Sequence, residues 1–240
     1  MENSNVSRLE EAMALEDKEL IVYTCITGNY EECLTHSCLE EGLSYLCFSD
    51  NESNVPVGWT YMPIKGLDHL DNKDKNRYIK MHPSKFLPNH KLSIYIDFNI
   101  EVIGRISNLI SSINSSDNSI FMYQHPFRDC IYAEARSAIK QGLTSFFATK
   151  KQIKSYQQIN LPKAHGLFEA NIIIRKESSV TSRLMESWSE EYKTGSRRDQ
   201  IALMAASFKT GIQIKSLGEC YLREGSGGFF FLDISKRKRK

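Results

Sequence analysis

The segment 93–100 (Ser-Ile-Tyr-Ile-Asp-Phe-Asn-Ile) constrains the fold more than any other part of this chain. An apolar run with strand character ends there in Asp97 and Asn99, two oxygen-bearing side chains that are one residue apart. In an α/β sheet, ligands bind beyond the carboxyl ends of the strands, so the pattern predicts a binding edge at these two residues. A carboxylate and an amide oxygen suit Mg²⁺ or Mn²⁺ when substrate phosphates and water complete the coordination shell. Taken alone, an Asp-x-Asn at a strand end is more often a turn in which the side chains bond the backbone.

Strand-like and helix-like segments alternate before this point. Apolar, β-branched runs predict strands at 19–26, 43–49, 59–64 and 92–96, and a short helix is expected at 74–81 before His82-Pro83. An alternation of strands and helices of this kind is typical of an α/β fold with a mostly parallel sheet.

The second part of the chain is richer in helical patterns. We expect helices at 103–113, after Asp129 as the capping residue, and in two segments with apolar side chains at helical spacing. These two segments carry Val180, Leu184, Trp188 and Tyr192, and Ile201, Met204, Ala205 and Phe208, and all eight side chains are expected to face the core. Strands are expected at 119–123 and 170–175.

The composition indicates a single globular domain. A chain of 240 residues with 41% hydrophobic and 25% charged residues has ordinary globular values, and it is long enough to bury a real core. We expect a polar extension at 1–18, one α/β domain at 19–222 and a tail at 223–240. Because residues 1–18 are polar and acidic, without an apolar signal segment, we expect a cytoplasmic protein.

The cysteines and the charges indicate which kinds of site the sequence does not favour. Six scattered cysteines without a Cys-x-x-Cys pair or matched histidines predict free, mostly buried thiols rather than disulfides or a zinc site. A net charge of +2 gives no indication of nucleic-acid binding. Residues 236–240 are five consecutive cations that follow the aromatic run 229–232. They form either a solvated tail or a peripheral contact with the inner, anionic face of a membrane.

The order of several motifs resembles one known family. The matching segments are 21–30, 45–51, 80–83, 86–88, 95–100, 125–134, 166–171 and 198–201, within about residues 20–205. Together they are similar to the DUF616 family of glycosyltransferase-like proteins, which is related to plant mucilage-related glycosyltransferases and to bacterial polysaccharide-locus proteins. The resemblance implies a single GT-A (Rossmann-like) domain and a hexosyltransferase-like, metal-dependent enzyme. It also implies a nucleotide-sugar donor, with a UDP-sugar favoured, and a glycan or glycolipid acceptor.

The resemblance also implies roles for particular residues. Residues 19–100 would bind the nucleotide and its phosphates, and the candidates are Thr27, Gly28, Asn29, Tyr30, Asp50, Arg77, Lys80 and His82. Asp97 and Asn99 would hold Mn²⁺ or Mg²⁺, with a third protein ligand unassigned although His125 and His165 are candidates. Residues 101–222 would act on the sugar and the acceptor, with Asp199, and after it Glu169, as the catalytic base. The other candidates in that half are His125, Arg128, Asp129, Asn171 and Gln200.

Most of these residues also have a purely structural interpretation. Asp50 with Asn51 could simply turn the chain, Arg77 and Lys80 could form an exposed basic helix face, and Asp199 could cap a helix. Arg128 and Asp129 could form an ion pair in the wall of a pocket. Two other functions also fit the sequence, namely a metal-dependent hydrolase of a lipid or sugar amide or ester, and a catalytically silent nucleotide-sugar-binding protein.

Overall fold

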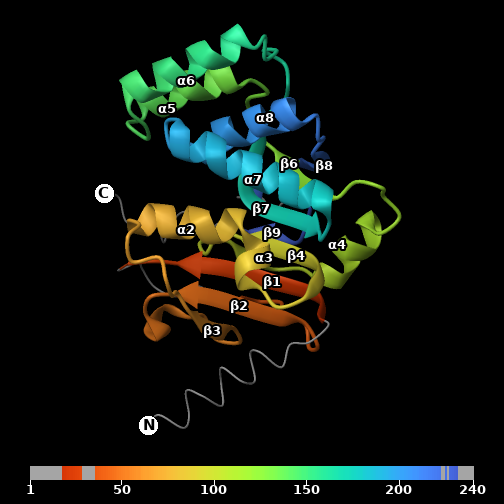
Figure 1. Cartoon of the computed structure of the whole chain (residues 1–240). Coiled ribbons are helices and arrows are strands. Elements are labelled where there is room, and N and C mark those ends of the chain that lie inside the picture. Colours follow the sequence, from red (N-terminus) through yellow and green to blue (C-terminus); the bar gives the residue numbers. More distant parts are fainter. Residues whose placement is uncertain (1–17, 29–35, 223–224, 226, 232–240) are drawn as a thin grey trace. The chain divides into compact units, whose positions relative to one another are not determined.

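The computed structural model describes residues 18–28, 36–222, 225 and 227–231 (Figure 1). These residues form two compact units. Unit 1 contains the described residues up to Ser115, then Arg175–Glu177, and those from Leu222 onward, and unit 2 contains Ser116–Ile174 and Ser178–Tyr221. The predicted candidates Asn29 and Tyr30, and the cations at 236–240, lie outside the described residues.

Unit 1 is built on four parallel strands in the order β3-β2-β1-β4. They are β1 Lys18–Ile26, β2 Ser44–Ser49, β3 Thr60–Pro63 and β4 His90–Ile96. The side chains of β2 are buried along its whole length, as expected of a parallel strand that is covered on both faces. The strands predicted from apolar runs are therefore confirmed, with small changes at their ends.

The helices of unit 1 are short and begin at recognisable signals. They are the 3₁₀ helix η1 Glu52–Asn54, α2 Asn72–Met81, α3 Pro83–Phe86 and α4 Ile106–Ile113. Asp71 caps α2 by accepting a 2.8 Å hydrogen bond from the backbone N–H of Asp74. Helix α4 starts three residues later than predicted, because Glu101–Val102 form the strand β5 instead of leading into the helix.

Strand β5 pairs with a segment from the far end of the chain. Phe230–Phe231 form β9, antiparallel to β5, and the N–H of Ile103 bonds the carbonyl of Phe229 at 2.9 Å. Gly104 permits this approach, since a Cβ there would lie 2.3 Å from the carbonyl oxygen of Gly228. Phe230 is completely buried. Phe230, part of the aromatic run before the basic tail, is therefore not available for a surface contact.

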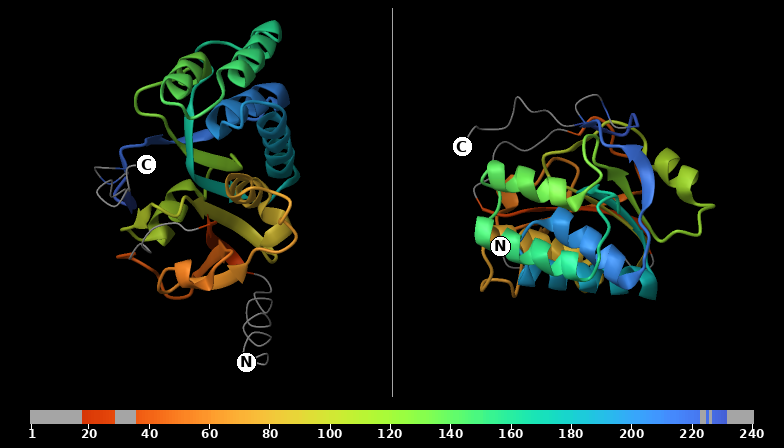
Figure 2. Two further views of the ribbon diagram at one scale, coloured as in Figure 1. Left: turned by 90° about the vertical axis from the view of Figure 1, so that its left-hand side faces the viewer. Right: turned by 90° about the horizontal axis from the view of Figure 1, so that it is seen from above.

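Unit 2 contains three strands and four helices. Its strands follow the order β7-β6-β8, with β6 parallel to β8. The strands are β6 Ile120–Gln124, β7 Phe168–Lys176 and β8 Lys215–Glu219, and the last two residues of β7 belong to unit 1. The helices are α5 Ile131–Lys140, α6 Phe146–Gln158, α7 Ser179–Thr194 and α8 Asp199–Thr210. Helices α5 and α6 pack side by side, as do α7 and α8 (Figures 1 and 2).

Several local predictions for unit 2 need correction. The N-cap of α5 is Cys130 rather than Asp129, and Asp199 is the first residue of α8 rather than its cap, which is Arg198. Val180 is 40% exposed although its spacing predicted a core position. Helix α6 and strand β8 were not predicted.

The predicted α/β class with a mostly parallel sheet flanked by helices is confirmed by these elements. The five described cysteines are free, and Cys25, Cys47 and Cys220 are buried, as expected. None of the helices in the described part of the chain is both long and apolar enough to cross a membrane.

Candidate functional site

In unit 1, the turn after β1 is held by three hydrogen bonds. The backbone N–H of Gly28 donates to Oδ2 of Asp50 at 2.8 Å, and the Gly28 carbonyl accepts from Asn54 at 3.2 Å. The Thr27 hydroxyl donates to the carbonyl of Asn72 at 2.8 Å. Gly28 has φ +77, and a Cβ there would lie 2.4 Å from the Asn72 side chain, so a glycine is required. The structure therefore brings together the predicted nucleotide-binding residues Thr27, Gly28 and Asp50.

Three candidate basic side chains at the end of α2 differ in their surroundings, namely Arg77, Lys80 and the following His82. Lys80 is completely buried, whereas Arg77 is partly buried and its guanidinium donates to Oδ1 of Asn76. His82 is 8% exposed, stacks on Tyr78 and places Nδ1 2.8 Å from the Tyr78 carbonyl oxygen. The structural interpretation of Arg77 and Lys80 as an exposed basic helix face is therefore not valid for Lys80.

Asp97 follows β4 and begins a tight turn, in which its carbonyl accepts from the N–H of Ile100 at 2.9 Å. The turn interpretation thus holds for the backbone, while the carboxylate has other partners. Its Oδ1 accepts from the Tyr95 hydroxyl at 2.9 Å and lies 3.4 Å from Nζ of Lys80. Burial, with a further contribution from the negative charge of Asp97, raises the pKa of Tyr95 well above its usual value. Tyr95 therefore stays a neutral donor to this carboxylate.

A divalent cation at this turn would have few protein ligands. Among the described residues, no group of three or more His, Cys, Asp or Glu side chains could hold a metal ion. Asp97 and the half-buried Asn99 offer hard oxygen donors, and the Asp97 side chain is 28% exposed. Such a donor set fits Mg²⁺ or Mn²⁺ only if substrate phosphates and water supply most of the coordination shell.

In unit 2, a polar network starts at His125, directly after β6. Its Nδ1 accepts from the backbone N–H groups of Phe127 and Arg128 at 3.1 and 3.2 Å. Its Nε2 lies against the Arg128 guanidinium and 3.5 Å from Oε1 of Glu169. Burial, and next the positive charge of Arg128, lower the pKa of His125, so the ring is neutral at pH 7.

Glu134 is the centre of this network. The side chain is 1% exposed, and its Oε2 accepts from Nε of Arg128 at 2.9 Å. Its Oε1 accepts from Nε and Nη2 of Arg198 at 3.1 and 2.8 Å. The predicted pairing of Arg128 with Asp129 is corrected, because the guanidinium turns to the buried Glu134 and Asp129 is exposed.

Glu169 and Gln200 extend the network to its more exposed side. The amide of Gln200 donates to Oε2 of Glu169 at 2.7 Å, and the amide oxygen of Gln200 accepts from Arg198. The Glu169 side chain is 25% exposed, whereas Gln200 is 4% exposed. Asn171 lies on the same face of β7 as Glu169, but its amide contacts the sulfur of Cys220 instead of this network.

Asp199 is more enclosed than Glu169. Its side chain is 7% exposed, and Oδ1 accepts from the N–H of Gln200 at 3.2 Å and lies 4.0 Å from Nη1 of Arg198. Its carbonyl accepts from the indole N–H of Trp188 at 2.9 Å, which anchors the start of α8. The structure thus brings together the predicted residues His125, Arg128, Glu169, Asp199 and Gln200 within unit 2.

Sequence reasoning assigned no site role to two members of this network, Glu134 and Arg198. Both occur inside segments that carry the family resemblance, and a glutamate in the first turn of a helix, beside apolar residues, is a usable signal of pairing. The alternative third metal ligand, His165, packs edge-on against Phe208, and burial lowers its pKa.

The sequence matches the family described as TOD1/MUCI70, glycosyltransferase-like domain, over residues 40–221, which is more than half of the chain. This is a DUF616 family, so the resemblance expected from the motifs is confirmed. Comparison with curated protein sequences gives no match.

Solved structures of glycosyltransferases align with this chain at low sequence identity. The apo form of mouse xyloside xylosyltransferase 1 aligns with a TM-score of 0.50 at 10% identity, covering 93% of this chain and 100% of the other. The galactosyltransferase LgtC, in complex with donor and acceptor sugar analogs, aligns with a TM-score of 0.47 at 13% identity, covering 81% and 72%. The WbbM bifunctional glycosyltransferase aligns with a TM-score of 0.49 at 11% identity, covering 85% and 39%. At such identities the likeness to the xylosyltransferase concerns the fold alone, and that fold is GT-A. The chain therefore belongs to the TOD1/MUCI70 family of glycosyltransferase-like domains and is a glycosyltransferase with a GT-A fold.

Proposed function

We propose that this glycosyltransferase moves a sugar from a nucleotide-sugar donor, preferably a UDP-sugar, to a polysaccharide or glycoconjugate acceptor, with Mg²⁺ or Mn²⁺ as cofactor. The observation that carries the proposal is the network of unit 2, where the partly exposed carboxylate of Glu169 is oriented by Gln200 and backed by a buried Glu134 with two arginines. A charged network of this kind is expensive to bury, so its retention around one accessible carboxylate favours a catalytic role.

Unit 1 would bind the nucleotide and its phosphates. The turn at Thr27 and Gly28, fastened to Asp50, lies where a β-strand ends, which is where α/β folds receive nucleotides. Asn29 and Tyr30, which follow in the sequence, would also contact the nucleotide. Arg77 and His82 would supply positive or hydrogen-bonding groups for the diphosphate, whereas the buried Lys80 would act through Asp97.

The proposed metal site is Asp97 with Asn99. When bound there, a divalent cation would neutralise charge that develops on the leaving diphosphate. Lys80 holds Oδ1 of Asp97 from the protein interior, and Tyr95 donates to the same oxygen. Both contacts fix the orientation of the carboxylate before a ligand arrives.

Unit 2 would act on the sugar and the acceptor. An inverting transfer requires a carboxylate that accepts the proton of the acceptor hydroxyl. The sequence nominates Asp199 first, and the exposed fractions of the two side chains, 7% and 25%, favour Glu169. His125, Arg128, Asp129, Asn171 and Gln200 would position the acceptor or the sugar around that carboxylate.

We also propose that the protein is cytoplasmic. Its cations at 236–240 would contact an anionic membrane surface.

The decisive experiment is a thermal-shift panel of UDP, GDP, CMP and dTDP sugars, each with and without Mn²⁺. A donor at 100 times its dissociation constant should raise the free energy of unfolding by about 2.7 kcal/mol. We expect a UDP-sugar to stabilise the protein most, and to stabilise it more with Mn²⁺. Release of UDP in the presence of a glycan acceptor then measures transfer. Stabilisation by none of the four donor classes would contradict the proposal.

A further inference from the structure

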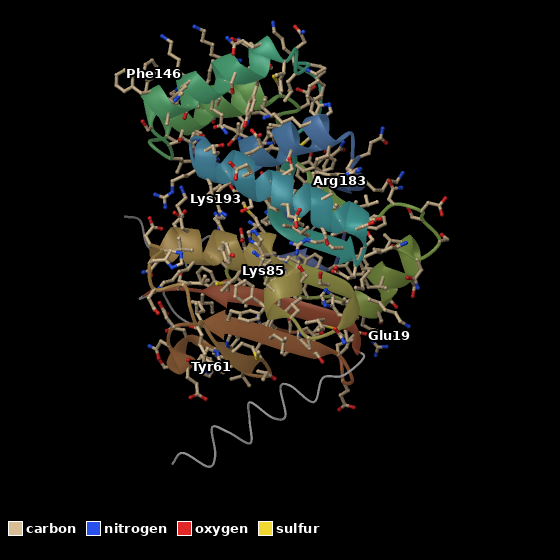
Figure 3. The ribbon with its side chains drawn as sticks, viewed as in Figure 1. Glu19, Tyr61, Lys85, Phe146, Arg183 and Lys193 are labelled. Carbon is tan, nitrogen blue, oxygen red and sulfur yellow. The ribbon has the colours of Figure 1, made fainter. Side chains whose placement is uncertain are left out.

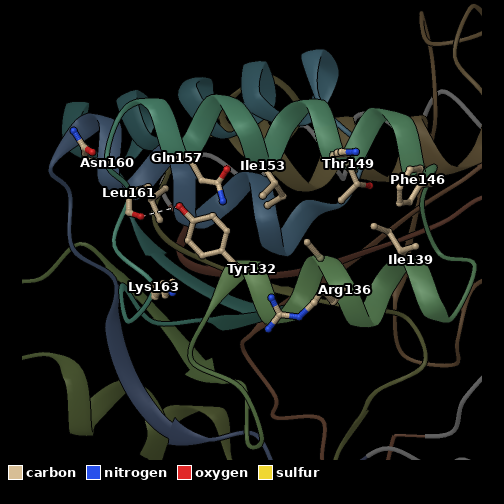
Figure 4. A pocket seen from close by; sticks show the side chains of 12 residues that line it. Tyr132, Arg136, Ile139, Phe146, Thr149, Ile153, Gln157, Asn160, Leu161 and Lys163 are labelled. Carbon is tan, nitrogen blue, oxygen red and sulfur yellow. Dashed lines mark hydrogen bonds between the residues drawn. The ribbon is translucent and has the colours of Figure 1, made fainter.

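The helical hairpin of α5 and α6 carries a surface that lies outside the proposed site residues. Residues of both helices line an open cavity of about 630 Å³, and Tyr132 and Ile139 of α5 point toward α6 in Figure 4. The cavity closes at one end, where the Tyr132 hydroxyl donates to the carbonyl of Leu161 at 2.8 Å.

Between Glu134 and Glu169, all charged side chains of the segment that contains most of this hairpin are positive. No aspartate or glutamate occurs between Glu134 and Glu169, while the whole protein has a net charge of only +2. Six cations occur in the same segment, namely Arg136, Lys140, Lys150, Lys151, Lys154 and Lys163. On the buried side of α6, Glu191 accepts from Tyr156 at 2.8 Å and pairs with Lys209. The outer surface is therefore strongly cationic.

Large apolar side chains are exposed on the same surface. Phe147 is 82% exposed, Phe146 51% and Leu143 46%, and the two phenyl rings pack edge to face with centroids 5.4 Å apart. Phe146 projects from the beginning of α6 in Figure 3. Three of the eight large apolar side chains exposed in the described part of the chain thus fall within five consecutive residues, which makes them a patch rather than scattered exposures.

Helical geometry places the aromatic and basic side chains together. At about 100° per residue, the residues Phe146, Phe147, Lys150, Lys151 and Lys154 fall within an arc of about 140°. The buried side chains of α6, those of Thr149, Gln152 and Tyr156, occupy the opposite side. The helix therefore presents an exposed stripe of phenyl rings and ammonium groups with no acidic group on it, and Phe146 and Lys150 at one edge of the stripe also line the cavity.

We infer that this outward face of α6, together with Leu143, is a peripheral docking surface for an anionic membrane. Phe146, Phe147 and Leu143 enter the interface between headgroups and acyl chains, while Lys150, Lys151 and Lys154 lie against the anionic headgroups. Basic side chains beside exposed aromatic ones are the combination that holds an amphipathic helix in that interface. An acidic oligosaccharide bound in the cavity would match the charge, but it would leave Phe147, which does not line the cavity, without a function.

The test is sedimentation of the full chain with vesicles of phosphatidylcholine alone and of phosphatidylcholine with phosphatidylglycerol. We expect binding only to the anionic vesicles, with a decrease as salt is added. Phe147→Ser should weaken that binding by about tenfold, because it removes one buried phenyl ring from the bound state. The matched control is Phe127→Ser, which removes a phenyl ring that is 80% exposed elsewhere in unit 2 and should leave vesicle binding unchanged.

Two charge-reversal variants, one on the proposed surface and one outside it, test the contribution of the lysines. Lys151→Glu should weaken vesicle binding by about tenfold, and Lys215→Glu, at an exposed lysine of β8, should not. Because Phe147 is outside the proposed catalytic residues, Phe147→Ser should leave UDP release with a water-soluble acceptor unchanged. In Phe147→Trp, tryptophan emission should shift to the blue when anionic vesicles are added.

Three outcomes would overturn the inference. They are failure of the unmodified chain to bind anionic vesicles, equal weakening by Phe147→Ser and Phe127→Ser, and a Phe147→Trp emission that vesicles do not change. Binding of a soluble polyuronic acid that is lost in Arg136→Glu but retained in Phe147→Ser, without vesicle binding, would assign the cavity to an acidic glycan instead.

Discussion

The side-chain amide of Gln200 donates a 2.7 Å hydrogen bond to Oε2 of Glu169, and so orients the more exposed of the two candidate catalytic carboxylates. Gln200 comes from the first turn of α8 and Glu169 from the start of β7. The bond therefore couples the position of the carboxylate to the beginning of a buried helix. A group held in this way is already oriented before the acceptor binds.

We predict that Glu169→Gln lowers the transfer rate by about 10² to 10⁴ while UDP affinity stays close to normal, because a general base contributes to the reaction and not to nucleotide binding. Asp199→Asn is the matched variant, since it also removes one charge and preserves shape. Transfer rates beside UDP calorimetry distinguish the two. A larger loss in Asp199→Asn would make Asp199 the base, and loss of UDP binding in both variants would contradict the assignment of unit 2 to the acceptor.

Asp50→Ala should have the opposite effect. It removes the acceptor for the Gly28 N–H, which loosens the turn after β1, so UDP affinity should fall by about tenfold, the usual worth of a hydrogen bond to a charged group. Calorimetry with UDP measures the change. The control is Asp68→Ala, at an exposed aspartate of unit 1. Unchanged UDP affinity in Asp50→Ala would exclude this turn from the nucleotide site.

Asp97→Ala should abolish the Mn²⁺-dependent part of nucleotide-sugar binding while the protein stays folded. Asn99→Asp should raise cation affinity, because it adds a second carboxylate to the turn. Thermal shifts with UDP-sugar, measured over a Mn²⁺ titration, test both changes. If Asp97→Ala binds donor and Mn²⁺ like the unmodified protein, the metal site lies elsewhere.

Removing the charge of Glu134 should destabilise the protein. In Glu134→Gln the guanidinium groups of Arg128 and Arg198 lose a shared buried carboxylate, which should cost about 2 to 4 kcal/mol, less than for fully buried partners because both arginines are partly exposed. Urea unfolding measures this cost. Asp129→Asn, five residues earlier and exposed, should change the free energy of unfolding by less than about 0.5 kcal/mol.

The stability of the protein should fall below pH 6.5 in part through His36. Burial lowers the pKa of His36 from 6.5 to about 4 in the folded protein, and Nδ1 accepts a 3.2 Å hydrogen bond from the N–H of Val102. Because the unfolded chain binds this proton more readily, the contribution of His36 is fully present above pH 6.5 and is lost progressively as the pH falls toward 4.

His36→Gln should therefore show a smaller decrease in melting temperature between pH 6.5 and 4 than the unmodified protein. His69→Gln, at an exposed histidine, serves as the control. Parallel pH profiles for the unmodified chain and His36→Gln would show that His36 does not contribute.

The strands of unit 1 could be predicted from the sequence because their burial is a local property. A parallel strand covered on both faces is a continuous apolar run, and β1, β2 and β4 have this pattern. The position of Asp97 just after such a run likewise followed from the order of residues alone.

Helix α6 escaped prediction because two of its three buried side chains are polar. It buries Thr149, Gln152 and Tyr156, so its inward face has no hydrophobic period. Its two phenylalanines, Phe146 and Phe147, are exposed instead, which reverses the usual pattern.

Most residues of the candidate site could thus be identified from the sequence, while the pairing of their side chains was decided only by the tertiary structure. Local rules assign Arg128 to its neighbour Asp129, yet the guanidinium bonds Glu134, which also receives Arg198 from 64 residues away. Strand β5 likewise pairs with β9 from the far end of the chain. Local patterns record the preference of each segment for a helix or a strand. Pairing between distant segments depends on which buried charges and backbone groups can satisfy one another once the chain has folded.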